Sequence, residues 1–567
     1  MRRHLLAATV LLLGAAELSA ADPQLPPIVF QAQSVGRIFD AFRTAANLAG
    51  GEKAAKSINK TLQEMFGEKG LEGLDLNRPI VGYVILAPKP EDITAVIALP
   101  VVGEKEFLEL CDRINRVKMK VDEKDKTLYH LPPLNPRYKA MLRLMDGYAY
   151  IAYGFNPAKH IEAKALVPMP KLFDPSETGI FAGRAYFDRI PDEVKKAAPS
   201  LFAEVKKTMF GGSWGNVIRV FRFPGEQMAA SKLVDEQIDK LLARLAKLSS
   251  GADILSVRLN LDPQAGAFVA ETAIKPKPGS ELARMIAAWK PTTNRFGAIA
   301  AHPDTVFGLR TRLPLFLEEL QTAANGTVEG LAKAGSLVAP ADARPTIDEL
   351  VKGIVRTVKS GEVDIAVAVR GPDKDGWFTA VGALAFEDPS NLEKELRKYI
   401  EKEAPREVQD NLKWNAASVE KVNIHTFKIP AGGGFFFGKQ FGDAPVMAFA
   451  FAPRGVYFAM SPDPVPVLKD ALTQKPVEAP VVDLVANHAR VRKLIRKMAP
   501  NAAEAARVEE WFGKEDKLAS IASLSVAGGT ELTIKFTLDM RGIPRIFLHS
   551  FGVAESSIET PVPPGKY

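Results

Sequence analysis

The sequence contains one cysteine, Cys111, among 567 residues. A single thiol cannot form an intramolecular disulfide, so stability must come from the burial of apolar surface. The composition allows this, because 47% of the residues are hydrophobic and 25% are charged, as in ordinary globular proteins. Cys111 falls on the apolar face of an expected helix, where we expect a small buried side chain rather than a nucleophile.

Long hydrophobic runs are missing after the first residues of the chain. The apolar run 5–16 follows Arg2 and Arg3 and precedes small residues at 19–21, which indicates a secretory signal peptide over residues 1–21. No later stretch approaches the roughly 18 uninterrupted apolar residues of a membrane-spanning helix. We therefore expect an exported bacterial protein, periplasmic or extracellular, that is soluble after signal-peptide cleavage.

An excess of one charge is also missing. The formal net charge is +7 and falls to +6 without the signal segment, because Arg2, Arg3 and Glu17 together carry +1. One basic cluster stands out, at Arg490, Arg492, Lys493, Arg496 and Lys497. Because acids alternate with bases elsewhere, we interpret this cluster as a solvated helix face and expect no nucleic-acid partner.

Histidines at metal-ligand spacing are absent. None of the seven histidines has another four residues away, and there is no H-E-x-x-H. Asp373 and Asp375 before Gly376 resemble the start of a calcium loop, but Gly382 occupies the position of the required acid; Asp-Gly between apolar runs instead predicts a hairpin turn. We predict no metal and no cofactor, and we interpret His130 and His425 as residues on strand surfaces.

Residues 431–442, AGGGFFFGKQFG, contain G-x-x-x-x-G-K from Gly433 to Lys439. A phosphate-binding loop must open a helix and supply a hydroxyl for Mg²⁺. Here Gln440 replaces the hydroxyl residue, and another expected strand follows soon after. The pattern therefore favours a glycine-rich hairpin loop over a nucleotide site.

Two catalytic motifs occur in the wrong context. The G-x-S-x-G at 211–215 follows a helical pattern and precedes a strand, the reverse of a nucleophile elbow. The S-x-x-K at Ser57 to Lys60 lies on an expected amphipathic helix without its companion motifs. We interpret both as chance matches, and no catalytic residue is predicted.

The phenylalanines of the glycine-rich loop are unusual, because loops are normally polar. Phe435, Phe436, Phe437 and Phe441 lie close to Lys439. One interpretation is that they fold back to cover the sheet edge or to pack against the rest of the chain. The other is an apolar contact loop that inserts into a membrane surface or a partner's groove, with the lysine near anionic lipid.

The chain also contains an internal similarity. TAVIALPVVGEKEFLELCDRI at 94–114 aligns without gaps on TAVGALAFEDPSNLEKELRKY at 379–399. Upstream, IVFQAQSVGRIF from Ile28 resembles TVFGLRTRLPLF from Thr305, and strand-turn-helix patterns recur downstream. We interpret this as a tandem duplication with copies at 22–290 and 295–545 and a tail at 546–567.

Periodicity predicts the elements of each copy. Helices are expected at 54–66 and 347–358, each followed by a hairpin and another helix. Further strands are expected near 127–131, 147–153, 423–429 and 446–459, and each copy closes with a long helix and alternating strands. Adjacent hairpins favour an α+β fold, with antiparallel sheets covered by helices on one face and two pseudo-symmetric copies.

With these units in view, the chain resembles exported bacterial proteins of uncharacterised function that carry a tandemly duplicated α+β unit. The resemblance covers most of the mature chain and lies in LDLNRPIVGYV, TAVIALPVVGEKEFLEL and DGYAYIAYG. It implies no catalytic residues.

Two functional hypotheses follow. The first is an exported non-enzymatic binding or envelope-associated protein, with an apolar groove between the copies for a hydrophobic small molecule or a membrane surface. The alternative is an exported hydrolase with an unrecognised active site. An enzyme would carry polar residues in one copy where the other has apolar ones, and the best-aligned unit shows no such difference.

Overall fold

The structure, a computed structural model, describes most of the chain between residues 25 and 542. The described ranges are 25–66, 68–87, 92–115, 118–135, 138–195, 250–314, 344–429, 439–453, 455–499, 501–512 and 521–542. The expected signal peptide at 1–21 and the expected tail at 546–567 lie outside these residues.

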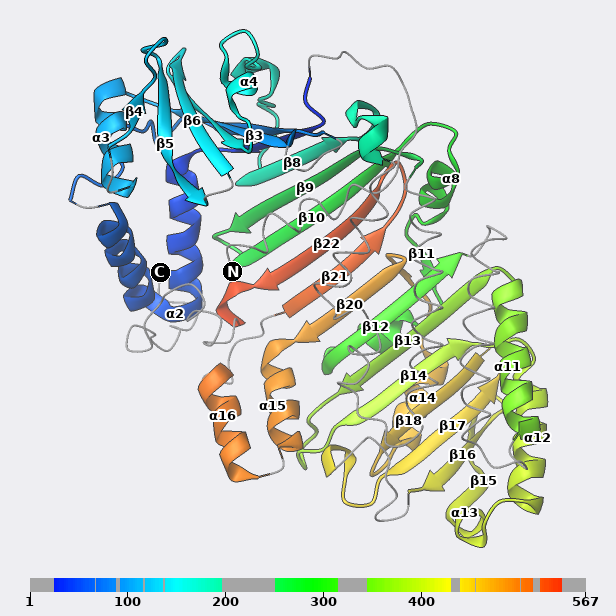
Figure 1. Ribbon diagram of the computed structural model, residues 1–567. Coiled ribbons are helices and arrows are strands. Elements are labelled where there is room, and N and C mark those ends of the chain that lie inside the picture. Colours follow the sequence, from blue (N-terminus) through cyan, green and yellow to red (C-terminus); the bar gives the residue numbers. More distant parts are fainter. Residues whose placement is uncertain are drawn as a thin grey trace.

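Within the described residues, one antiparallel sheet of 20 strands connects the two ends of the structure (Figure 1). One half lies in the spatial order β4 (Lys120–Val121), β5 (Leu128–Asn135), β6 (Tyr138–Met145), β7 (Tyr148–Gly154), β3 (Thr94–Pro100), β2 (Ile80–Ile85), β1 (Ile28–Ala32), β8 (Phe181–Tyr186), β9 (Ala252–Asp262) and β10 (Ala267–Pro276). The mixture of helices with a large antiparallel sheet confirms the predicted α+β class.

The sheet continues from β10 without interruption. The other half lies in the order β22 (Leu532–Asp539), β21 (Ile521–Ala527), β20 (Val482–Asn487), β12 (Thr305–Pro314), β13 (Glu362–Arg370), β14 (Thr379–Ala385), β18 (Gly455–Ser461), β17 (Val446–Ala452), β16 (Val422–Lys428) and β15 (Leu412–Val419). Strands β11 (Thr292–Asn294) and β19 (Val477–Ala479) form a separate pair. The sequence did not predict that β10 and β22 would join the halves into one sheet.

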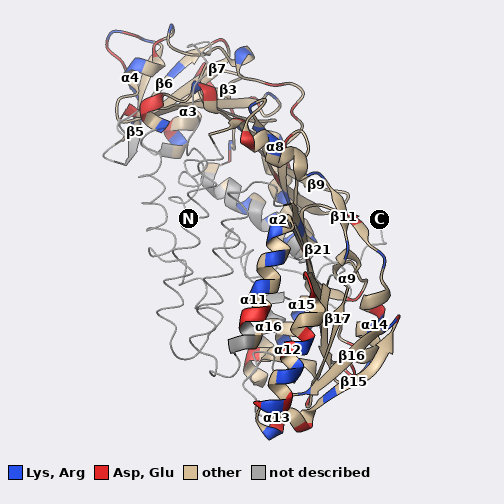
Figure 2. Cartoon of the chain, turned by 90° about the vertical axis from the view of Figure 1, so that its right-hand side faces the viewer, with Lys and Arg blue, Asp and Glu red and all other residues tan. Residues whose placement is uncertain are grey.

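The longer helices lie on one side of the sheet. Figure 2 shows α2 (Val35–Phe66), α11 (Arg344–Lys359), α12 (Pro389–Lys402), α15 (His488–Met498) and α16 (Ala502–Phe512) on that side. Helices α9 (Gly297–Ala300) and α14 (Val465–Thr473) lie on the opposite side. The remaining helices are α3 (Glu104–Asn115), α4 (Ala158–Ile161), α8 (Glu281–Ala288) and α13 (Arg406–Asn411), with short 3₁₀ turns η2 (Met169–Lys171), η3 (Phe187–Arg189), η6 (Lys439–Phe441) and η7 (Met540–Gly542).

Small side chains allow the short helices to approach the sheet. Strands β13, β14, β17 and β18 present fully buried alanines to α9 and α14, where Ile299 and Leu468 fill the space. An alanine surface lets a helix backbone pack close, because no long side chain separates the layers. At the other end of the sheet, Ile161 of α4 belongs to a core cluster that contains Ala98 and Ala152 as well as the larger Tyr83 and Tyr150.

Cys111 is buried, and because it is the one cysteine of the sequence it forms no disulfide within the chain. It packs with Phe107 and Leu110 of α3 against Leu142 of β6. Burial raises its pKa to about 11, and Asp112 adds to this effect. The thiol therefore stays protonated and acts as a small hydrophobic group, as predicted.

Some predicted elements differ in extent. Residues 138–145, which lie between the strands expected near 127–131 and 147–153, form the additional strand β6. The single strand expected at 446–459 is the hairpin β17–β18. The helix predicted at 54–66 is the second part of α2, which begins at Val35 and is interrupted at Gly51 (φ +76°). The Asp375-Gly376 turn joins β13 and β14 as predicted, with Gly376 at φ +79°.

Candidate functional site

The four strands at the centre of the sheet separate polar from apolar side chains. In β22, Leu532, Ile534, Phe536 and Leu538 alternate with Thr533, Lys535, Thr537 and Asp539. Residues directly opposite each other in an antiparallel sheet point to the same face. The pairing of β9, β10, β22 and β21 therefore gathers one apolar row after another on a single face.

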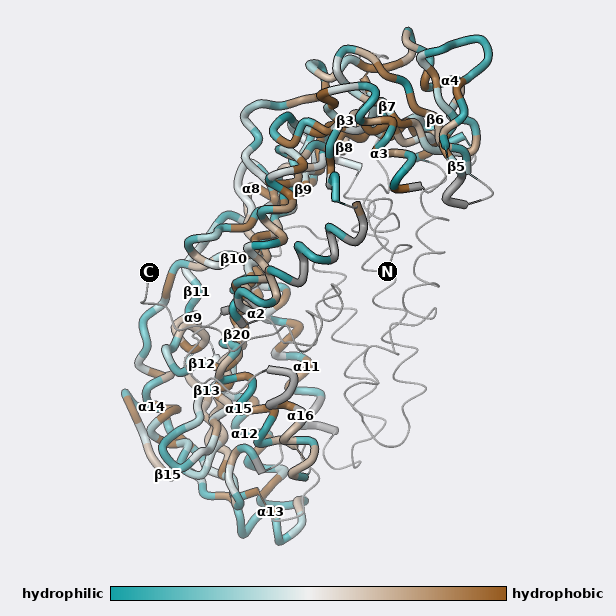
Figure 3. Tube along the Cα trace, turned by 90° about the vertical axis from the view of Figure 1, so that its left-hand side faces the viewer, coloured by the Kyte–Doolittle hydropathy of each residue, from teal (hydrophilic) through white to brown (hydrophobic). Residues whose placement is uncertain are grey.

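We call this surface the junction face. It consists of Val257, Leu259, Phe268, Ala270, Thr272, Leu524, Val526, Ile534, Phe536 and Leu538. Only Thr272 among these is polar. Figure 3 shows brown, hydrophobic stretches along strands such as β3 and β7. The junction face is the part of the sheet where the two halves meet.

Part of the neighbouring apolar surface is covered and part is open. At one end of the same strands, Leu255, Ile274 and Leu532 pack with Ile286 of α8 and Val358 of α11. In contrast, the ring of Phe536 is 37% exposed, although it lies in the middle of the sheet. Phe307 of β12, on the same face, is 38% exposed. Large aromatic side chains left this open on a central strand are typical of a contact surface.

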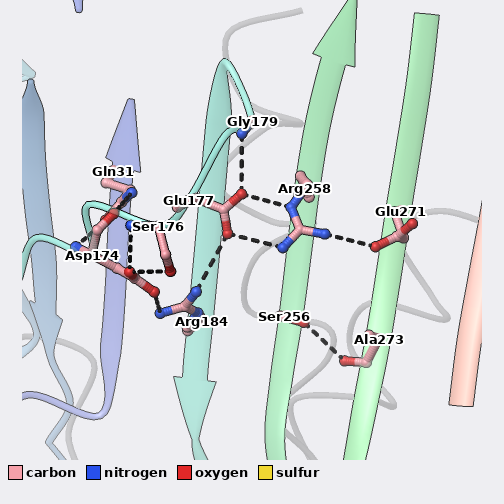
Figure 4. A network of polar contacts seen from close by, with 10 residues as sticks. All are labelled: Gln31, Asp174, Ser176, Glu177, Gly179, Arg184, Ser256, Arg258, Glu271 and Ala273. Atoms are coloured by element: carbon pink, nitrogen blue, oxygen red, sulfur yellow. Dashed lines mark hydrogen bonds and ion pairs between the residues drawn. The ribbon is translucent and has the colours of Figure 1, made fainter. Parts of the chain in front are cut away.

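The opposite face of the central strands carries a network of charges (Figure 4). Glu177 precedes β8, and its side chain is only 3% exposed. Arg258 of β9 donates to both of its carboxylate oxygens, at 2.6 and 3.1 Å, and a third donor is the backbone N–H of Gly179 at 3.1 Å. Arg258 also donates to Glu271 of β10 at 2.9 Å.

The network continues toward β1 through a second arginine. Arg184 of β8 contacts Glu177 at 3.4 Å and Asp174 at 2.7 Å. Gln31 of β1 exchanges two hydrogen bonds with the backbone of Asp174, at 2.8 and 2.9 Å. The segment that carries Asp174 and Glu177 is thereby fixed across four strands.

The pKa values show that these carboxylates are ionised. Burial alone would raise the pKa of Glu177, but Arg258, the Gly179 N–H and Arg184 outweigh it and lower the pKa. Hydrogen bonds from Ser176 and Arg184 lower the pKa of Asp174 to about 2. Because the carboxylate oxygens of both acids are already paired, this network holds the sheet together and leaves no group for a ligand.

A second polar cluster lies between α12 and β15 to β17. His425 of β16 is fully buried, so the interpretation of this residue as a strand-surface histidine was wrong. Its Nδ1 accepts a hydrogen bond from the backbone N–H of Asn415 at 3.0 Å. Its Nε2 lies 3.3 Å from Oε1 of Glu393, within ion-pair distance but not hydrogen-bonded.

Aromatic rings enclose this histidine. The centroids of Trp414, Phe449 and Phe451 lie 4.9, 5.2 and 6.1 Å from that of the imidazole. Arg397 of α12 covers the Trp414 ring at 4.2 Å from its centroid and lies 3.4 Å from Glu393. A histidine beside a glutamate could act as an acid-base pair, but here the imidazole has no access to a substrate.

The predicted contact loop lies partly outside the described residues. Phe435, Phe436 and Phe437 are not described. Lys439 begins the 3₁₀ turn η6. Phe441 is 2% exposed and packs in a core with Phe378 and Met460, so this ring faces the interior.

The glycine-rich segment does connect antiparallel strands, β16 and β17, which is hairpin geometry. Gln440 occupies the position where a phosphate-binding loop needs a hydroxyl, and it is 4% exposed. Its backbone carbonyl oxygen accepts a hydrogen bond from the backbone N–H of Phe378. The G-x-S-x-G motif at 211–215 lies outside the described residues. The S-x-x-K motif at Ser57 to Lys60 lies on helix α2, as expected.

Sequence reasoning missed the junction face and the network around Glu177. The signal for the first was present, because β22 alternates perfectly, but only the pairing with β10 makes it continuous. The charged network could not be found in this way, since Glu177 and Arg258 are 81 residues apart.

Among the described residues, no group of three or more His, Cys, Asp and Glu side chains could hold a metal ion. None of the described helices is long and apolar enough to cross a membrane. Comparison with protein-family models, with curated proteins and with solved structures found no match.

Proposed function

We propose that the protein is an exported, non-enzymatic binding protein that takes up a hydrophobic small molecule on the junction face. The observation that carries this proposal is the exposure of Phe536 in the middle of a continuous apolar surface. A surface of this kind favours a ligand rich in apolar groups, because its burial releases water from both partners. The signal-peptide pattern of residues 1–21 supports export to the periplasm or beyond.

A tandem duplication with pseudo-twofold symmetry is part of this proposal, and the strand register supports it. The sequence match of Thr94 with Thr379 can be extended from strand to strand through directly paired residues. This procedure relates Val81 to Ala366, Phe30 to Leu309, Gly183 to Leu484, Val257 to Leu524, and Glu271 to Lys535.

The last of these correspondences matters most. Glu271 and Lys535 are also direct partners across the β10–β22 pair. Corresponding residues face each other only where a twofold axis passes between them. The junction face would then be the surface on the axis, shared equally by both copies. The strand register relates Phe30 to Leu309, whereas the sequence alignment matches it with Phe307. These two positions are two residues apart in β12, so both lie on the same face of the sheet.

The experiment is native mass spectrometry of residues 22–567 purified from the envelope fraction, with solvent extraction of any bound molecule. We expect a co-purifying hydrophobic compound, or saturable binding of a fluorescent apolar probe to the emptied protein. Phe536→Ser should weaken probe binding at least about fivefold, because it removes roughly 1 kcal/mol or more of buried aromatic contact.

Val102→Ser is a matched control, since Val102 is 75% exposed and follows β3, which β2, β1 and β8 separate from β9 in the sheet. Unchanged probe affinity in Phe536→Ser, with a protein that is always empty, would remove the proposal. Probe affinity lowered equally by both variants would indicate nonspecific surface binding and would count against it as well.

Contact with a membrane surface is a separate expectation from the phenylalanine loop. Because Phe441 packs in the core, the test is limited to Phe435, Phe436 and Phe437, replaced together by serine. Flotation with vesicles that contain anionic lipid should decrease in this variant. Equal flotation of the variant and the parent protein would remove the membrane contact.

The alternative, an exported hydrolase, finds little support. One difference of the kind expected of an active site does occur in the best-aligned unit, contrary to the interpretation of the sequence: Glu393 corresponds to Leu108. The strand register relates the neighbouring His425 to Tyr129. However, the imidazole is completely buried. A general base must reach the proton that it removes, so this pair suits another role.

A further inference from the structure

The cluster around His425 fixes an irregular part of the outermost strand. Among the described strands, β15 pairs with β16 alone, and its register shifts between Lys413 and Ala417. Within this irregularity Asn415 has φ +53°, the left-handed region that non-glycine residues rarely adopt. The hydrogen bond from its N–H to His425 Nδ1, at 3.0 Å, stabilises this conformation.

The protonation state of the ring follows from that hydrogen bond. A backbone N–H can only donate, so Nδ1 must carry a lone pair, and the neutral ring must hold its proton on Nε2. The Nε2 proton then lies on the side of Glu393, 3.3 Å away. Only the neutral form with this tautomer suits both neighbours.

We infer that His425 is a proton-sensitive latch that holds β15 against β16 and α12 when neutral and releases it when protonated. A proton taken from solvent binds the Nδ1 lone pair. The imidazolium then has an N–H at each nitrogen, and the one on Nδ1 opposes the N–H of Asn415. The backbone of Asn415 loses its acceptor, and the strained segment loses the contact that maintains it.

The surroundings determine the direction of the effect. The charged groups that face His425 are Glu393 and Arg397, both on α12, whereas β15 offers Trp414 and the Asn415 N–H, and β17 offers Phe449 and Phe451. Burial lowers the pKa of His425, Glu393 opposes this, and Arg397 lowers it further. The net pKa lies below the ordinary value of 6.5.

The sign of the linkage follows. An opened segment exposes a histidine of ordinary pKa, which binds a proton more readily than the buried one. The closed form is therefore fully favoured above pH 6.5, and opening becomes easier as the pH falls below this value toward the lowered pKa. Each pH unit in that window makes opening up to about tenfold easier.

Hydrogen-deuterium exchange of the full mature chain tests the latch. Exchange in peptides that cover β15 is measured at pH 7 and pH 5 and corrected for the intrinsic chemical rate. We expect β15 to open more readily at pH 5 than at pH 7, by a factor of up to about thirty, while peptides from β4 and β5 at the other edge change little.

Variants distinguish an effect of His425 protonation from a general destabilisation of the protein at low pH. His425→Gln keeps an acceptor for the Asn415 N–H but does not titrate, so its β15 exchange should be the same at both pH values. Arg397→Met should reduce the pH response, because it removes the charge that lowers the pKa of His425. Glu393→Gln should increase it for the opposite reason. His130→Gln, on the far edge strand, is the matched control and should respond like the parent protein.

Two results would overturn the latch: equal β15 protection at pH 7 and pH 5 in the parent protein, or an unchanged pH response in a folded His425→Gln. If His425→Gln does not fold, the opposite shifts expected of Arg397→Met and Glu393→Gln decide the matter. Equal pH responses in these two variants would contradict the assignment to His425.

Discussion

At the scale of single residues, a buried charge in this protein stays ionised where it has specific partners. Glu177 illustrates this, since a carboxylate with a side chain only 3% exposed would otherwise become protonated. Two donors from Arg258 and one from a backbone N–H replace the lost water. Removal of a single partner would leave the buried carboxylate without enough donors and should therefore destabilise the protein.

Arg258→Met tests this vulnerability. The substitution keeps the aliphatic stem but leaves Glu177 buried with fewer donors, so we expect a loss of about 2 kcal/mol in the free energy of unfolding. Urea denaturation measures it. Arg284→Met is the control, because the Arg284–Glu281 pair is 4.0 Å apart and both side chains are about half exposed; it should change stability by less than about 0.5 kcal/mol.

A second residue-scale prediction concerns His488 at the start of α15. Burial lowers its pKa to about 4, Arg492 adds to this, and Asp539 opposes it. The unfolded chain binds a proton near pH 6.5 and the folded chain near pH 4, so the folded state is destabilised as the pH falls through this window. The loss is on the order of 3 kcal/mol at its limit.

Thermal unfolding between pH 7 and pH 4 measures this effect. His488→Gln should flatten the dependence of the melting temperature on pH over this range. His130→Gln, on an exposed strand, should leave the dependence unchanged. A melting temperature that falls equally in all three proteins would assign the acid sensitivity to other groups.

At the scale of elements, local sequence patterns predicted much of this fold. The features that depend on contacts between distant residues were not predicted. The alternation in β22 and the turn at Asp375-Gly376 are visible in a few consecutive residues, so both were predicted. Strand β6 was missed because prolines at 132, 133 and 136 precede it and are typical of loops. The burial of His425 was missed because its cover comes from α12, more than twenty residues earlier in the chain.

The pairing of β10 with β22 leads to an element-scale prediction. Lys535 lies directly opposite Glu271, and unlike charges at opposed positions of antiparallel strands stabilise the pair. Lys535→Glu should therefore lower the free energy of unfolding by about 1 kcal/mol, more at low salt than at high salt. Lys275→Glu, at an exposed β10 position beyond the β10–β22 register, is the control and should have little effect.

At the scale of the whole molecule, one sheet connects residues that are hundreds of positions apart. Because the β10–β22 hydrogen bonds are continuous with both halves, opening either half exposes an edge strand of the other. We expect the described part of the chain to unfold in a single cooperative transition. Two copies joined only by a linker would unfold separately.

Ala270→Pro tests this coupling. Proline in a central strand removes a ladder hydrogen bond and costs about 3 kcal/mol or more. We expect this variant to unfold in two transitions, with fluorescence and circular dichroism midpoints that no longer coincide. Ala270→Val keeps the N–H and should retain a single transition. One coincident transition in Ala270→Pro would show that other contacts couple the halves.

The opposition of Glu271 and Lys535 also determines which strand each half can pair with. If β10 met β10 of a second molecule in the same register, Glu271 would oppose another Glu271, and a β22 homodimer would oppose two lysines. Like charges in this position repel, so neither strand pairs favourably with the same strand of a second molecule. A sheet edge left open during folding is thus a poor partner for the same edge of another molecule, which protects crowded nascent chains from β10–β10 and β22–β22 association.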